Sequence, residues 1–166
     1  MKQKLRLLFV FFLITFSVSV LGQTSLLPNE VSLFSFKTDN DKIVLLAKDK
    51  NNGYIIYRFG TTTKVEFEYP NKTKNSWSQF KYYYYSRGGG KQNDAVNIAH
   101  VSFINGDYEY MLYDDYSSEN DEFSIGVLVT HLKSGKLTDI KGKLKTKKGF
   151  LCNFKGSELL EVKEDY

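Results

Sequence analysis

The chain has 166 residues, of which 42% are hydrophobic and 16% aromatic, and its formal net charge is +4. Three of its basic residues lie in the first 22 positions, so the other 144 residues carry a net charge of only +1. This balance argues against a nucleic-acid-binding protein, which needs a strong basic footprint. The remaining length suits one domain that buries a hydrophobic core.

The N-terminus has the pattern of a secretory signal peptide. Three basic residues precede an apolar run from Leu7 to Leu21, and Val20-Leu21-Gly22 offers a small-residue cleavage site. The alternative is an uncleaved membrane anchor, but the run is shorter than the about 20 residues that span a bilayer. We therefore predict that residues 1–22 are removed and that the mature protein is secreted or periplasmic, with no stable membrane span.

Cys152 is the only cysteine, so an exported form of this chain has no internal disulfide and its fold must rest on packing. Its neighbours Phe150, Leu151 and Phe154 indicate a small buried hydrophobic side chain. An intermolecular disulfide or a reactive thiol is the alternative.

After the signal peptide we expect a flexible leader at residues 23–30 and a single β domain at residues 31–166. The first two strands are predicted at Val31–Lys37 and Lys42–Lys48. A hairpin follows from Gly53 to Pro70, with a Gly/Thr turn between two strands rich in β-branched and aromatic residues.

The two strands of this hairpin differ in their side-chain pattern. In the second strand Val65, Phe67 and Tyr69 alternate with charged residues, so one face is apolar and the other is solvated. The first strand, Tyr54 to Phe59, is apolar on both faces apart from Arg58. This pattern is expected of a strand covered from two sides.

A second hairpin is predicted around Asn105-Gly106, the dipeptide preferred in two-residue type I′ turns. Such a turn fixes the register of Ala99–Ile104 against Asp107–Tyr113. Phe103 is then expected opposite Tyr108, and the apolar pairs share one side of the sheet. The pairs expected alongside it are Ile104/Asp107, Val101/Tyr110, Ala99/Leu112, Ser102/Glu109 and His100/Met111.

The rest of the chain adds short strands and polar connections. We predict strands at Trp77–Ser86, Phe123–Val129, Lys136–Ile140 and Gly149–Phe154, and a helical turn or a frayed end at Glu158–Tyr166. The acidic stretch Asp114–Asp121 and the basic stretch Lys141–Lys148 are expected to be solvated loops. Together these elements predict an all-β, single-domain antiparallel barrel or sandwich of about eight to ten short strands.

The strongest candidate for recognition is the aromatic strand with the glycine-rich loop that follows it. Tyrosine, tryptophan and arginine dominate binding hot spots, and a glycine-rich loop can adapt to a partner. The alternative is that the aromatic rings only fill the core. The candidate binding residues are Trp77, Tyr82, Tyr83, Tyr84, Tyr85, Arg87, Gly88, Gly89 and Gly90.

Catalytic and metal-binding patterns are weaker. Glu66 and Glu68 share a strand face at a spacing of about 7 Å, within the range of glycosidase carboxylates, although both are expected to face water. The loop Asp114–Glu122 is rich in carboxylates that could share calcium, but it lacks the EF-hand pattern. His100 and His131 have no local triad partners. We therefore assign no catalytic residue, no metal site and no cofactor.

Charge is segregated along the sequence. Residues 92–132 hold eight carboxylates and no lysine or arginine, whereas residues 133–148 carry seven lysines. An electrostatically polarised surface of this kind speeds the encounter with a charged partner. The simpler interpretation of the lysines is a solvated surface.

Several local motifs in the middle of the chain resemble those of small exported bacterial β-proteins of unassigned activity. The motifs are Tyr57-Arg58-Phe59-Gly60, Glu66-Phe67-Glu68-Tyr69-Pro70, Tyr83-Tyr84-Tyr85-Ser86-Arg87-Gly88-Gly89 and Gly106-Asp107-Tyr108-Glu109-Tyr110. A more distant likeness is to periplasmic lysozyme inhibitors, but this chain lacks their usual disulfide and C-terminal motif. The resemblance implies a bacterial β fold and no catalytic residue.

From these observations we expect a binding module that is not an enzyme, with a protein or a glycan of the cell envelope as its partner. An inhibitor of an envelope hydrolase is the most concrete version. A glycan-binding module that uses the same aromatic residues is the alternative. A glycosidase that uses Glu66 and Glu68 comes third.

Overall fold

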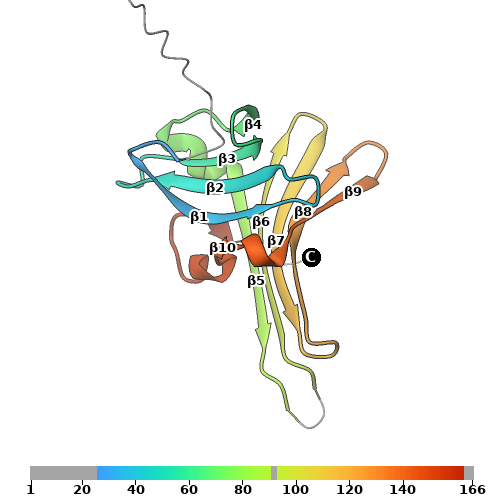
Figure 1. Cartoon of the computed structure of the whole chain (residues 1–166). Helices are drawn as coiled ribbons and strands as arrows, with labels where there is room; N and C mark the ends of the chain where they lie inside the picture. The colour runs from blue at the N-terminus through green and yellow to red at the C-terminus, as the bar shows by residue number, and fades with distance from the viewer. Residues whose placement is uncertain (1–25, 91–92, 163–166) are drawn as a thin grey trace, which may run out of the picture.

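The computed structural model describes residues 26–90 and 93–162 and shows an all-β sandwich of two sheets (Figure 1). The predicted fold class is therefore confirmed. The sequence left a barrel and a sandwich as alternatives. The structure is a sandwich, because the strands of the described residues form two separate sheets that do not close into a barrel. The predicted signal peptide, residues 1–22, lies outside this part of the chain. No helix within it is long and apolar enough to cross a membrane.

The smaller sheet is built mainly from the N-terminal third of the chain. Its strand order is β10-β1-β2-β3-β4, and all its pairs are antiparallel. The short strand β10, from the C-terminal part of the chain, thus lies beside β1, with Phe34 opposite Gly149. The strands are β1 (Glu30–Lys37), β2 (Ile43–Asp49), β3 (Ile55–Gly60), β4 (Val65–Tyr69) and β10 (Lys148–Gly149).

The larger sheet has the order β11-β5-β6-β7-β8-β9, and only its β11–β5 pair is parallel. Three short 3₁₀ helices connect the sheets: η1 (Lys74–Gln79), η2 (Leu144–Thr146) and η3 (Leu151–Phe154). The strands are β5 (Phe80–Arg87), β6 (Val96–Asn105), β7 (Tyr108–Ser117), β8 (Glu122–His131), β9 (Lys136–Lys141) and β11 (Glu161–Val162).

The strands of the smaller sheet run across those of the larger one, and they cover only the upper part of β5–β8 (Figure 1). The lower part of these four strands and their two hairpin loops extend beyond the smaller sheet. We call this extension the arm. Because one face of an antiparallel sheet can remain in water, the arm can present polar side chains without losing its strand structure.

The core between the sheets is an aromatic cluster centred on Phe103. Its ring centroid lies 4.6 Å from that of Tyr69, 5.0 Å from Tyr110 and 5.1 Å from Tyr57. Aromatic pairs at these separations add to the stabilisation from buried area. This cluster fixes how the two sheets cross, since its rings come from β3, β4, β6 and β7.

The hairpin predicted at Gly53–Pro70 forms as β3 and β4. Phe67 and Tyr69 pack against the core, as their alternation predicts. The opposite face of β3 is also covered, because Ile56 is fully buried with Leu45 and Ala47 in a second small cluster.

The hairpin at Asn105-Gly106 also forms, but its predicted register is wrong by two residues. Asn105 pairs with Tyr108, and Phe103 lies opposite Tyr110 rather than Tyr108. The turn residues are Gly106 and Asp107, and of these only Gly106 has a positive φ, +59°. Glycine at the first central position is typical of a type II′ turn, whereas type I′ needs positive φ at both positions. A shift of two residues keeps each side chain on its predicted face.

Several other boundaries differ from the prediction, and Glu161–Val162 form β11 where a helical turn or a frayed end was expected. Trp77 lies in η1 rather than in the strand. The strand β7 continues through Asp114 and Asp115, so the acidic loop is shorter than expected. Instead of a strand at Gly149–Phe154, the chain forms β10 and η3. Glu30, placed in the leader by the sequence, begins β1.

Candidate binding surface

The outer face of the larger sheet turns away from the core and carries a continuous row of polar and aromatic side chains. The pairing places Tyr83, His100, Tyr113, Gly126 and Lys141 side by side across β5–β9. Adjacent rows on the same face add Met111, Asp115, Ser124, Leu128 and Asp139. Because side chains in a strand alternate between faces, these residues come together although they are far apart in the sequence.

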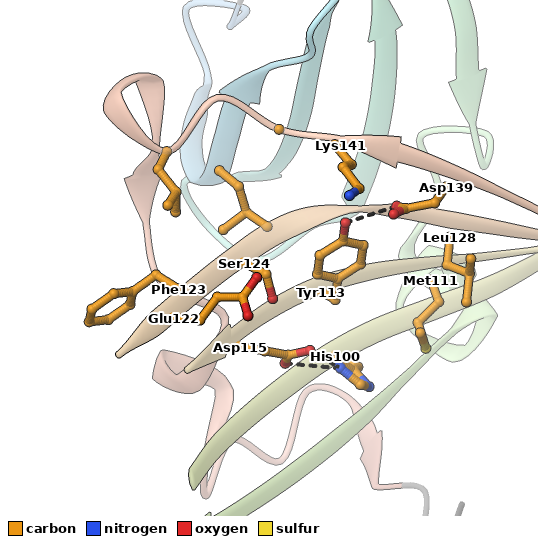
Figure 2. Close-up of a pocket in the computed structure, with 13 residues that line it drawn as sticks. His100, Met111, Tyr113, Asp115, Glu122, Phe123, Ser124, Leu128, Asp139 and Lys141 are labelled. Carbon is orange, nitrogen blue, oxygen red and sulfur yellow. Dashed lines mark hydrogen bonds and ion pairs between the residues drawn. The ribbon is translucent and has the colours of Figure 1, made fainter. Parts of the chain in front are cut away.

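A groove of about 460 Å³ lies on this face (Figure 2). Its lining includes the apolar side chains Met111 and Leu128 and also Leu144 of η2. Acidic, basic and hydroxyl groups also line it. Binding sites commonly combine an apolar lining with a few polar groups that orient a ligand. The polar lining residues are His100, Tyr113, Asp115, Glu122, Ser124, Asp139 and Lys141.

His100 and Asp115 form one polar pair of the groove. The His100 Nε2 atom lies 3.0 Å from the Asp115 carboxylate, and the Tyr83 ring lies 5.9 Å from the imidazole. The Asp115 carboxylate also accepts a hydrogen bond from the backbone N–H of Ala99 at 3.3 Å. These contacts hold the imidazole and the carboxylate in a fixed arrangement beside the groove.

Tyr113 and Asp139 form the second pair. The Tyr113 hydroxyl donates to Asp139 at 2.8 Å, as Figure 2 shows. Burial and this hydrogen bond both raise the pKa of the Tyr113 phenol, so it stays protonated and acts as a donor. The ring lies over Gly126, where an added Cβ atom would meet the hydroxyl oxygen at 2.3 Å. Glycine at this position therefore lets the ring lie flat on the sheet.

The nine predicted binding residues do not share one surface. Trp77 and Tyr82 belong to the core, with 8% and 2% of their surface exposed. The Trp77 indole donates to the Asn52 carbonyl at 3.0 Å. Both side chains therefore follow the core-filling alternative and are not available to a partner.

The remaining tyrosines alternate across β5. Tyr83 and Tyr85 lie on the outer face, and Tyr85 is 42% exposed. Tyr84 lies on the opposite face, where the Lys155 ammonium is 4.9 Å from its ring centroid. Exposed Arg87 donates to the Asp94 carbonyl at 3.1 Å. Gly88, Gly89 and Gly90 are exposed at the tip of the β5–β6 hairpin.

The carboxylates of the predicted acidic loop point in different directions. Asp114 is buried, pairs with Lys147 and accepts the backbone N–H of Leu151 at 3.1 Å. Asp115, the next residue, lies on the outer face with His100. Within residues 26–90 and 93–162, no three His, Cys, Asp or Glu side chains are placed to hold a metal ion. Lys147, predicted in a solvated basic loop, instead joins this loop to β7.

The paired glutamates of β4 lie in ion pairs. Glu68 binds Arg58 at 2.6 Å and Lys72 at 2.9 Å, and Glu66 pairs with Lys42. Burial opposes ionisation of Glu68, but its hydrogen bonds to the two cations outweigh burial and lower its pKa. A general acid needs a raised pKa, so the environment of Glu68 does not suit it to that role.

The groove residues on β8 and β9 were not predicted from the sequence. Asp139 and Lys141 belong to a strand whose sequence has no feature that marks a binding site. Tyr113 is the last residue of the strand that was predicted for β7. The one available signal was the small residue Gly126 inside an apolar strand, which often marks a close approach of another group.

Comparison of the chain with protein-family models, curated proteins and solved structures found no match.

Proposed function

We propose that this protein is an exported bacterial binding module that recognises another macromolecule of the cell envelope or its surroundings through the outer face of its larger sheet. Inhibition of an envelope hydrolase is the most concrete form of this activity. The signal-peptide pattern of residues 1–22 supports export.

The observation that carries the proposal is the groove on the outer face of the larger sheet, a face that also carries Tyr83 and Tyr85. Tyr85 has 42% of its surface exposed. Exposure of its aromatic ring to water is unfavourable, and a partner that packs against the ring would bury it. Next to it, the exposed glycines of the hairpin tip can adjust to a partner without the steric limits of a Cβ atom. An aromatic anchor beside hydrogen-bonding groups is the composition of interface hot spots.

The test is retention of a protein from native envelope extract by the immobilised mature domain. Tyr85→Ser is expected to weaken retention of the same protein, identified by mass spectrometry, by tenfold or more, because hot-spot truncations cost about 2 kcal/mol. Tyr108→Ser is the matched control, since Tyr108 is 44% exposed at the other end of the sheet. Equal retention by both variants and the parent would contradict the proposal.

A second candidate is binding of a soluble glycan by the same face. The pairs His100–Asp115 and Tyr113–Asp139 offer acceptors and donors for sugar hydroxyls, and Tyr83 and Tyr85 offer rings for stacking. Saturable binding of a neutral oligosaccharide that is lost in Tyr85→Ser would favour this candidate. Tyr84→Ala is then expected to bind normally, because Tyr84 lies on the opposite face.

A further inference from the structure

The first three residues of β8, Glu122–Ser124, lie beside the groove and have no neighbouring strand on the β9 side within the described part of the chain. The strand β9 pairs with β8 only from Gly126 to His131, and the chain then leaves the sheet (Figure 1). The last contact is the hydrogen bond from the Gly142 N–H to the Ile125 carbonyl at 2.8 Å. No strand of the described residues pairs with Glu122–Ser124 on that side.

The hydrogen-bonding groups of this edge can be assigned from the period of the strand. Ile125 directs its carbonyl to the β9 side, so Phe123, two residues earlier, directs its N–H and carbonyl to the same side. An open edge is a template for another extended chain. The Phe123 ring is 53% exposed and Leu144 is 45% exposed, so apolar surface adjoins the edge.

The charged side chains that line the groove are mainly acidic. Asp115, Glu122 and Asp139 line the groove, against Lys141 as its one lysine. The carboxylate of Asp115 is bonded to His100 and that of Asp139 to Tyr113, yet a carboxylate can accept further hydrogen bonds. The apolar side chains Met111 and Leu128 in the groove lining suit the methylene stem of a lysine or arginine whose charged head reaches these carboxylates.

Resting on the proposed role as a binding module, we infer that the open edge of β8 at Glu122–Ser124 receives an extended, basic segment of a partner protein. The segment adds to the sheet beside Phe123 in the position that β9 leaves open. Its alternate lysine or arginine side chains lie in the groove against Asp115, Glu122 and Asp139. Main-chain hydrogen bonds supply affinity in this mode, and the side-chain contacts supply specificity.

The first experiment measures binding of a fluorescent peptide, acetyl-(Lys-Val)₃-amide, to the mature domain by anisotropy. The same peptide with glutamate in place of lysine is expected to bind at least about tenfold more weakly, and added salt is expected to weaken the lysine peptide. Two further peptides carry backbone N-methyl groups, one on the lysines and the other on the valines. One of them is expected to bind about tenfold more weakly, because its methyl groups block the hydrogen bonds to the strand edge.

The second experiment uses variants that differ in one charge. Glu122→Gln and Asp139→Asn are each expected to weaken binding about two- to fivefold. Glu119→Gln removes the same charge from the exposed β7–β8 turn outside the groove lining and is expected to leave binding within the error of the parent. Amide exchange at Phe123 is expected to slow on addition of the peptide, which reports strand addition independently of affinity.

Equal binding of the glutamate and lysine peptides, full affinity of both N-methylated peptides, or unchanged exchange at Phe123 would overturn the inference. So would preferential binding of a neutral oligosaccharide in the groove. Each of these outcomes leaves the proposed function standing if the extract test still depends on Tyr85. Loss of that dependence would overturn the proposed function itself.

Discussion

Replacing Glu30 by glutamine should destabilise this protein more than any exposed charge replacement, because it breaks a buried ion pair. The Arg58 guanidinium donates to both Glu30 oxygens, at 2.6 and 2.7 Å, and to Glu68 at 2.6 Å. Arg58 is 2% exposed and the Glu30 side chain is fully buried. Burial opposes ionisation of Glu30, but the bonds from Arg58, the Leu27 N–H and Tyr54 outweigh it and lower its pKa.

The size of the effect follows from what Glu30→Gln leaves behind. Arg58 stays buried and charged with Glu68 as its remaining anion, and removing one partner of a buried pair costs about 3–5 kcal/mol. With a urea slope of about 2 kcal/mol per molar, the unfolding midpoint should fall by about 2 M. The fluorescence of Trp77, the only tryptophan and 8% exposed, reports the transition.

Glu66→Gln is the control for this measurement. It removes the same charge from the pair with Lys42, whose side chains are 31% and 32% exposed, and exposed pairs contribute about 0–1 kcal/mol. If Glu30→Gln lost no more stability than Glu66→Gln, the buried pair would not stabilise the fold as argued.

Three further predictions concern stability. The free energy of unfolding should stay constant from pH 7 to about 5 and decrease as the pH falls through 4.5. The reason is that Glu30 and Glu68 have pKa values below the 4.5 of an unperturbed glutamate. In an acid titration, the decrease should be shallower for Glu30→Gln than for the parent. Tyr82→Phe should raise the free energy of unfolding in urea by about 1 kcal/mol, because the buried Tyr82 hydroxyl has no hydrogen-bond partner among the described residues. A loss of more than about 1 kcal/mol would contradict this reasoning. Gly126→Ala should lower the free energy of unfolding by about 1–3 kcal/mol, because the added methyl group displaces the Tyr113 ring from the sheet. In a Tyr113→Ala background the same substitution should have no such effect. An equal loss there would show that the ring is not the cause.

The features predicted correctly from the sequence are those that depend on the two-residue period of strands. Ile55, Tyr57 and Phe67 face the core because alternation assigns a face whatever the exact register. The hairpin around Gly106 was predicted, but its turn residues are Gly106 and Asp107 rather than Asn105 and Gly106. The turn is of type II′ rather than type I′, because only Gly106 has a positive φ.

Long-range pairing limited the prediction of the binding surface. The groove joins His100, Tyr113 and Asp139 from β6, β7 and β9. The predicted hairpin makes the strands of His100 and Tyr113 neighbours, but its register was wrong by two residues, and no local pattern in the sequence placed Asp139 beside them. For the same reason the burial of Arg58 was not predicted from the sequence. Its partner Glu30 comes from a segment that reads as a leader, although the cross-strand pair Arg58–Glu68 follows from the predicted hairpin.

The pairing of β1 with β10 has a consequence for folding kinetics. The chain cannot complete its first sheet until the residues near Gly149 are available, because Phe34 pairs with a residue 115 positions later. Contacts of such high sequence separation make folding slow. A nascent chain that stops short of this strand would expose the backbone edge of β1 to solvent and to other chains.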